Sequence, residues 1–222
     1  MATLAFDIYG TLINPYGIAE SLQQHIGDKS SVFAQIWRDK QLEYSFRRGL
    51  MGKYQNFTVC TRQALDYTCS FLQQDLSESV RDDLMMQYLN LPSFDDVVSG
   101  LELVKNHRIY AFSNGVYDDV KQLLENAKIQ HFFAGIISVD TIDSFKPDPA
   151  VYSHFIKQTH SIVDNTWLIS SNPFDVIGAR AVDWNAVWLQ RDSSAIFDPW
   201  EIQPTVTINR LEQLANELDI VS

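Results

Sequence analysis

Short apolar runs alternate with amphipathic segments along most of the chain. Runs typical of buried strands occur at Thr3–Phe6, Arg108–Phe112, Gly135–Val139, Thr166–Ile169, Ala186–Gln190 and Thr205–Ile208. Helix-like segments lie between or after them, at Asp118–Ala127, Pro149–His160, Phe174–Val182 and Asn209–Leu218. Alternation of this kind predicts an α/β fold in which helices cover a mostly parallel sheet.

One long stretch interrupts this alternation. From about residue 15 to residue 86 the apolar positions recur at helical spacing, as in Val32, Phe33, Ile36, Trp37 and Leu42, and no segment has the pattern of a strand. The pattern predicts a helical cap domain of residues 15–90, inserted after the first strand. Residues 1–14 and 91–222 would then form a Rossmann-like parallel-sheet core domain.

The net charge of the chain limits the classes of partner that it is expected to bind. The 222 residues carry a net charge of −11, which argues against a nucleic-acid partner. If the substrate is an anion, a few placed cations and helix N-termini must make the site locally positive. No run approaches the roughly 20 apolar residues that cross a bilayer, so we expect no membrane partner. The N-terminal residues lack the pattern of a signal peptide, which favours a cytoplasmic location.

The cysteines and histidines predict neither a disulfide nor a metal site. Cys60 and Cys69 fall on one helical segment, where nine residues separate them by ~13 Å, too far for a disulfide. The five histidines are scattered and no CxxC or HxxH pattern occurs. We therefore expect no metal and no cofactor.

Two motifs place polar groups at predicted strand ends. In the first, Asp7 ends an apolar strand and Gly10 follows in a turn. In the second, Ser113 and Asn114 end a strand before another glycine, and their side chains and backbone N–H groups suit a carboxylate or phosphate. Ligands of open α/β sheets bind at the carboxyl ends of strands. Either motif alone is more typical of an ordinary turn than of a site.

Two further motifs stand at predicted helix starts. Lys146 precedes Pro147 and Pro149, which fit the start of a helix, and its charge can neutralise a neighbouring carboxylate. Asp175 follows a strand and falls near the next helix N-terminus. Taken singly, the lysine fits a solvated loop, and the aspartate fits a first-turn acid stabilised by the helix dipole.

The four motifs in this order resemble those of the haloacid dehalogenase superfamily: nucleophilic Asp, Ser/Thr, Lys and a terminal acidic motif. The likeness spans most of the chain, and the helical insertion is similar in position to the cap of that superfamily. Phosphatases of the superfamily carry a second Asp two residues after the nucleophile, where this chain has Tyr9. A phenol with a pKa of ~10 is a poor proton donor near neutral pH, whereas a halide leaves without a proton.

The cap segment adds the most specific resemblance, to the L-2-haloacid dehalogenases. Residues 37–44 read Trp-Arg-Asp-Lys-Gln-Leu-Glu-Tyr, close to the corresponding segment of that family. The resemblance implies that Arg38 binds the departing halide together with Asn114. It also implies conversion of short-chain (S)-2-haloacids to (R)-2-hydroxyacids through an ester on Asp7, and a homodimer.

The resemblance implies a role for each remaining site residue. Asp175, with Lys146 nearby, activates water for hydrolysis of the ester, and Ser113 holds the substrate carboxylate. Charged groups are oriented by four residues: Thr11, Tyr152, Ser170 and Asn172. A small apolar pocket is formed by Tyr9, Leu42, Phe57 and Phe174, although these four are also compatible with packing between cap and sheet.

Two departures and two alternatives accompany this interpretation. Asp39 could weaken halide binding if it faces the site, and Pro173 could shift Asn172. The last motif offers only Asn172 and Asp175 to a magnesium ion, which is few carboxylates for a metal site. The alternatives are a magnesium-dependent phosphatase of the same superfamily and a non-catalytic binding protein on this scaffold.

Overall fold

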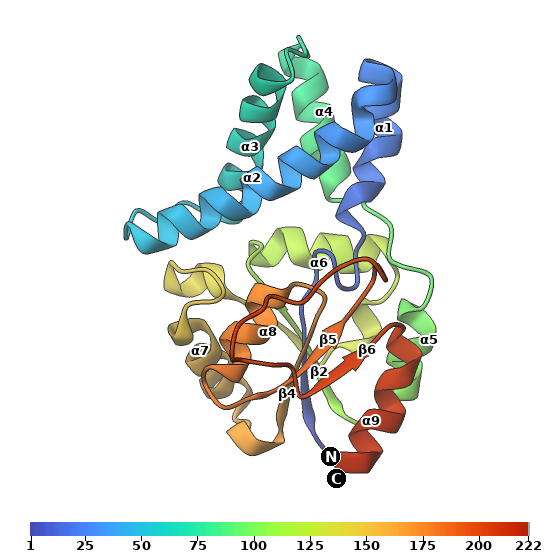
Figure 1. Cartoon of the computed structure of the whole chain (residues 1–222), viewed down its shortest axis with the longest axis vertical. Coiled ribbons are helices and arrows are strands. Elements are labelled where there is room, and N and C mark those ends of the chain that lie inside the picture. Colours follow the sequence, from blue (N-terminus) through green and yellow to red (C-terminus); the bar gives the residue numbers. More distant parts are fainter. Residues whose placement is uncertain (222) are drawn as a thin grey trace.

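The computed structural model describes the backbone of residues 1–221 and the side chains of residues 1–218. Its centre is one six-stranded parallel sheet of order β3-β2-β1-β4-β5-β6 (Figure 1). The strands are β1 (Thr3–Phe6), β2 (Arg108–Ser113), β3 (Gly135–Ser138), β4 (Thr166–Ser170), β5 (Asn185–Leu189) and β6 (Val206–Ile208). The predicted parallel α/β core is confirmed, and each predicted strand lies within one residue of its observed bounds.

Helices cover both faces of this sheet. One face packs against α5 (Val97–Leu103), α6 (Tyr117–Asn126) and α9 (Leu214–Val221), and the other against α7 (Pro149–Thr159) and α8 (Pro173–Arg180). In β1, Leu4 and Phe6 point to the first face and Ala5 to the second, as the period of two of a strand requires. All four residues of β1 are buried, because this strand lies in the middle of the sheet.

The last helix begins later than predicted. The sequence pattern placed its start at Asn209, but residues Leu211–Gln213 form a 3₁₀ turn and α9 starts at Leu214. The Gln213 side chain accepts hydrogen bonds from the backbone N–H groups of Asn209 and Arg210, and so holds the turn. The short helix α5 was not predicted, since seven residues show little periodicity.

Four helices lie between β1 and α5 in the chain: α1 (Ile18–Ile26), α2 (Ser30–Leu50), α3 (Phe57–Phe71) and α4 (Glu78–Tyr88). They stand together beyond the end of the sheet at which β1 finishes (Figure 1). Asn56 and Ser77 cap the first turns of α3 and α4 through their side chains. Cys60 and Cys69 are free thiols, both buried in α3.

Hydrogen bonds join the α1–α4 segment to elements around the sheet, namely α6 and the turn after β3. Tyr54 Oη donates to Asp140 Oδ1 at 2.6 Å, and Thr58 Oγ1 donates to Asp119 Oδ2 at 2.5 Å. The buried residues of α2 include apolar Phe33, Ala34 and Trp37 in its first half and polar Arg38, Gln41 and Ser45 further along. Among residues 1–221, no helix is both long and apolar enough to cross a membrane.

Candidate active site

The site lies where the strand order reverses. The chain adds β2 and β3 on one side of β1, then returns to place β4, β5 and β6 on the other side. Such a switch point opens a crevice at the carboxyl ends of the strands. Asp7 follows β1 directly, and its N–H donates to Ile169 O of β4 at 3.0 Å. Ser113 ends β2 and Ser170 ends β4, so all three predicted site residues reach the same edge of the sheet.

The two carboxylate oxygens of Asp7 have different surroundings. Oδ2 accepts from Thr11 Oγ1 at 2.8 Å, Asn172 Nδ2 at 2.6 Å and Ser170 Oγ at 3.2 Å. Among the described residues, only Lys146 Nζ donates to Oδ1, at 3.1 Å. The side chain is 11% exposed. Three donors therefore fix Oδ2, while Oδ1 keeps lone pairs with which it can attack an electrophile.

Lys146 links the two acids of the site. It stands just before α7, its side chain is 1% exposed, and Nζ lies 3.1 Å from Asp7 Oδ1 and 2.7 Å from Asp175 Oδ2. Nζ also lies 4.5 Å from the centre of the Phe112 ring. Burial lowers the pKa of Lys146, but Asp175 and Asp7 outweigh it and raise that pKa above its ordinary value. The ammonium is the local cation that an acidic protein needs to handle an anion.

Asp175 is fully buried in the first turn of α8. Its Oδ2 accepts from Lys146, and its Oδ1 accepts from Tyr152 Oη at 2.8 Å. Burial raises the pKa of Asp175 to about 6, with Lys146 lowering it and Asp7 raising it further. Gly178 permits this arrangement, because a Cβ there would overlap the Tyr152 hydroxyl. A carboxyl with this pKa is suited to accept a proton near neutral pH.

The turn after β1 and the start of α8 interlock around Asp7. Thr11 Oγ1 accepts from the Ser171 N–H at 2.9 Å, and Asn172 Nδ2 donates to Tyr9 O at 3.0 Å as well as to Asp7. Gly10 has a φ of +88°, which a glycine adopts without strain. Pro173 occupies the first position of α8 while Asn172 still contacts Asp7.

Arg38 is buried without a carboxylate partner among the described residues. From α2 its Nη2 donates to Tyr9 O at 3.2 Å, and its Nη1 donates to Gln41 Oε1 at 2.7 Å. Its neighbour Asp39 is exposed and accepts from Gln35 on the solvent side, so the negative charge faces away from the site. A guanidinium that is buried and not neutralised by an acid is suited to bind an anion.

Gln41 was missed by the sequence analysis. It is fully buried, accepts from both Arg38 and Tyr88 Oη, and donates to Thr61 Oγ1 at 2.5 Å. The available signal was its place on the same stripe of α2 as Trp37 and Arg38. Glutamine is usually exposed, however, so its burial could not be read from one sequence.

Asn114 contacts the loop that carries Lys146, and Ser113 contacts the turn that follows β2. Asn114 Oδ1 accepts from the Lys146 N–H at 2.8 Å, and Ser113 Oγ accepts from the Gly115 N–H at 3.0 Å. Both hydrogen bonds use oxygen atoms as acceptors. The Ser113 hydroxyl hydrogen and the Asn114 amide group are left to donate to a ligand.

The four residues of the predicted apolar pocket have different packing partners in the structure. Tyr9 packs on Phe57, with ring centres 5.6 Å apart. Phe174 packs on Phe46 of α2 at 5.0 Å, and Leu42 is half-buried one turn after Arg38. Burial raises the pKa of Tyr9 far above its ordinary value, so the phenol is a poorer acid here than in water. A single pocket formed by all four stays a prediction.

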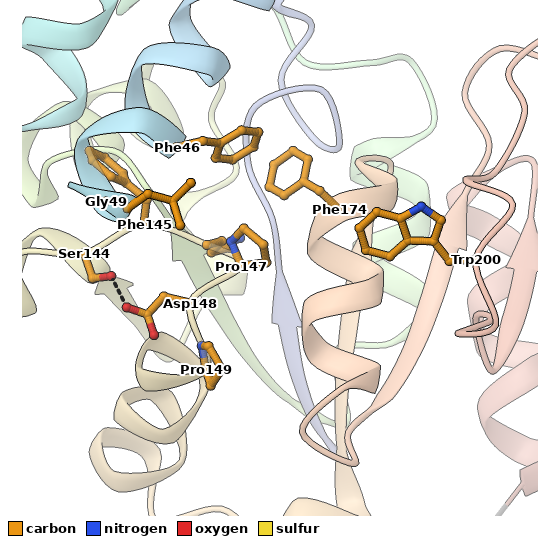
Figure 2. A pocket seen from close by; sticks show the side chains of 11 residues that line it. Phe46, Gly49, Ser144, Phe145, Pro147, Asp148, Pro149, Phe174 and Trp200 are labelled. Atoms are coloured by element: carbon orange, nitrogen blue, oxygen red, sulfur yellow. Dashed lines mark hydrogen bonds between the residues drawn. The ribbon is translucent and has the colours of Figure 1, made fainter. Parts of the chain in front are cut away.

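A cavity of about 550 Å³ adjoins the site (Figure 2). Lys146 and Phe174 line it, together with apolar residues that the sequence analysis had not singled out. Among the residues with described side chains, no group of three His, Cys, Asp or Glu is placed to hold a metal ion.

The parallel sheet, its helical insertion and the two acids joined by buried Lys146 are features of a hydrolase whose site uses carboxylates. The family profile described as haloacid dehalogenase-like hydrolase matches residues 1–183. The chain belongs to this family. The resemblance to L-2-haloacid dehalogenases is also confirmed, as the following relatives show.

The chain is 33% identical over 221 residues to (S)-2-haloacid dehalogenase 2 of Pseudomonas sp. (strain CBS-3), covering 99% of this chain and 96% of the relative. It is also similar to the L-2-haloacid dehalogenase of Xanthobacter autotrophicus, with a TM-score of 0.92 and 28% identity, covering 99% and 98%. The structure of that enzyme with chloropropionic acid covalently bound gives a TM-score of 0.91 and 27% identity, with the same coverage.

Proposed function

We propose that this chain hydrolyses short-chain (S)-2-haloacids to (R)-2-hydroxyacids through an ester on Asp7. The observation that carries the proposal is the asymmetry of the Asp7 carboxylate. Among the described residues, three donors hold Oδ2 while Lys146 alone donates to Oδ1, and the buried Arg38 donates to the carbonyl of Tyr9, two residues along the chain from Asp7. The similarity to a dehalogenase whose structure holds covalently bound chloropropionic acid supports the same reaction here.

In the first step, Asp7 Oδ1 attacks C2 of the substrate. The new C–O bond forms as the carbon–halogen bond breaks, so the halide leaves with the bonding electrons and C2 inverts. Arg38 and the Asn114 amide bind the halide. Ser113 and the backbone N–H groups beside it hold the substrate carboxylate, and Lys146 offsets its charge.

In the second step, water attacks the side-chain carbonyl carbon of the Asp7 ester. Asp175, with a pKa of about 6, is ionised at neutral pH and takes the proton from that water. The bond between the carbonyl carbon and the ester oxygen breaks, and Oδ1 leaves as the hydroxyl oxygen of the product with the proton that Asp175 took from water. The Asp7 carboxyl then loses its remaining proton to solvent and is a carboxylate again. C2 is not touched, so the inversion of the first step remains.

The magnesium-dependent phosphatase is the second candidate from the sequence, and the donor set disfavours it. A phosphate ester needs a proton for its leaving alcohol, and Tyr9 with its strongly raised pKa supplies one poorly. Both oxygens of Asp175 already accept hydrogen bonds, from Lys146 and Tyr152. Each such oxygen would have to exchange its donor for the metal ion.

Halide release tests the proposal directly. Incubation with (S)-2-chloropropionate in the presence of EDTA should release chloride and yield (R)-lactate, as measured by ion chromatography and chiral chromatography. Phosphate release from a phosphomonoester only with Mg²⁺ would support the phosphatase instead. Neither activity would support the non-catalytic binding protein.

Three properties stay predictions. The division into a cap of residues 15–90 and a core of residues 1–14 and 91–222 is supported by the grouping of α1–α4 beyond the sheet (Figure 1). Limited proteolysis would test this division, because cleavage is expected at the two domain boundaries, within residues 12–18 and within residues 88–96. The homodimer can be tested by light scattering, and the cytoplasmic location by cell fractionation.

A further inference from the structure

The cavity beside the site is almost entirely apolar. It combines Phe46, Gly49 and Leu50 of α2, Phe145 and Pro147 of the loop before α7, Phe174 of α8, and Trp200 of the loop before β6. Figure 2 shows the rings of Phe46 and Phe174 facing one another, with Trp200 next to Phe174. We call this space the vestibule.

The vestibule shares wall residues with the site. Lys146 lines it, and Lys146 Nζ lies 3.1 Å from the attacking oxygen of Asp7. Phe174, also in its wall, is followed directly by Asp175. A side chain that extends from C2 toward Lys146 and Phe174 therefore meets an apolar space.

The size of the vestibule exceeds what a short acid uses. Its volume of about 550 Å³ falls within the ~300–1,000 Å³ that ligand pockets of drug size occupy. The side chain of 2-chloropropionate is a single methyl group. In the proposed function, Ser113 and Lys146 hold the substrate carboxylate and Arg38 binds the halide, which leaves the vestibule for the hydrocarbon part.

We propose that the vestibule binds the hydrocarbon side chain of longer 2-haloacids, with roughly four to six carbons attached to C2. This inference rests on the proposed function and extends its substrate class beyond short chains. Each methylene that moves from water into the vestibule raises kcat/KM by up to about fourfold. The wall residues that set this preference are Phe46, Phe174 and Trp200.

Gly49 offers a test that leaves the reacting groups unchanged. It lies in the last turn of α2, and a Cβ there would meet Phe145 Cδ2 at 3.8 Å, an ordinary contact. Gly49→Leu should fill part of the vestibule without straining the helix. Gly49→Ala is the matched control, because it makes the same backbone change but adds only a methyl group.

The measured quantity is the ratio of kcat/KM for (S)-2-chlorohexanoate to that for (S)-2-chloropropionate. We expect a ratio of at least one for the unmodified enzyme. We expect it to fall about tenfold or more in Gly49→Leu and to stay within about twofold in Gly49→Ala. Trp200→Ala, at an exposed loop position, should lower the ratio severalfold. It takes the place of Gly49→Leu in the test if circular dichroism shows that Gly49→Leu is unfolded.

Two results would overturn the inference. One is a ratio below one in the unmodified enzyme. The other is a ratio that neither Gly49→Leu nor Trp200→Ala changes, because the side chain would then bind elsewhere. Chloride release from 2-chloropropionate reports on the proposed function itself, so loss of the chain-length preference with that activity intact would reject only the vestibule.

Discussion

Lys146 Nζ lies 2.7 Å from Asp175 Oδ2, and each of the two side chains is only 1% exposed. The same ammonium lies 3.1 Å from Asp7 Oδ1. One buried cation thus serves the nucleophile of the first step and the base of the second. Because Lys146 stays protonated, it can stabilise negative charge on either carboxylate while the reaction proceeds.

The raised pKa of Asp175 predicts the acid limb of the pH profile. The carboxylate accepts a proton from water, so ester hydrolysis should fall about tenfold per pH unit on the acid side of the pKa of Asp175. That pKa is about 6 in the free enzyme and should be lower in the ester, because the ester removes the charge of Asp7 that helps to raise it. Quenched-flow measurement of ester decay checks this limb. Asp39→Asn, which alters an exposed acid, should leave the limb in place. A rate that stays flat down to pH 4 would contradict the role of Asp175.

Removal of metal ions should leave the activity intact. The reaction that we propose takes its positive charge from Lys146 and Arg38. Chloride release from (S)-2-chloropropionate should therefore be the same, within error, before and after dialysis against EDTA. Loss of activity on chelation, restored by Mg²⁺ alone, would return the phosphatase to consideration.

Arg38→Lys should slow dehalogenation about tenfold to a hundredfold. Lysine lacks the planar fork that reaches both Gln41 and Tyr9 O, and an unsatisfied buried polar group costs about 1–3 kcal/mol. Arg47→Lys is the matched control on the same helix, since Arg47 is exposed and pairs with Glu43. Steady-state kinetics with 2-chloropropionate provide the measurement. Near-normal turnover of a folded Arg38→Lys protein would show that Arg38 does not bind the halide.

The origin of the product oxygen tests the covalent step. With enzyme in excess over substrate in ¹⁸O-water, a single turnover should give product that carries mainly unlabelled oxygen, because Oδ1 of Asp7 is transferred. Mass spectrometry of the peptide containing Asp7 should find the label there. Labelled product after the first turnover, with none in Asp7, would mean that water attacks C2 directly.

Much of the core was predictable because its signals are local. Buried strands such as Thr3–Phe6 are short apolar runs, and the carboxyl ends of parallel strands share one edge of the sheet. The sequence alone therefore predicted that Asp7, Ser113 and Ser170 lie close together. Lys146 and Asp175 lie near helix starts that are marked by prolines, so their positions relative to these helices could also be predicted.

Other features depend on contacts between residues distant in the chain. The sequence analysis assigned Asp7 its role but could not tell Oδ1 from Oδ2, because the three donors to Oδ2 come from positions 11, 170 and 172. Whether the Asp39 side chain faces the site or the solvent depended on how α2 is rotated about its own axis. The late start of α9 depended on one glutamine side chain.

By itself, the sequence determined the fold class, the order of elements and the residue types of the site, because periodicity and strand-end chemistry act over a few residues. The tertiary structure decided which carboxylate oxygen is free, that Gln41 holds Arg38, and that an apolar vestibule adjoins Lys146. These depend on distances between side chains from α2, α7 and α8. Only the packing of the whole chain sets those distances.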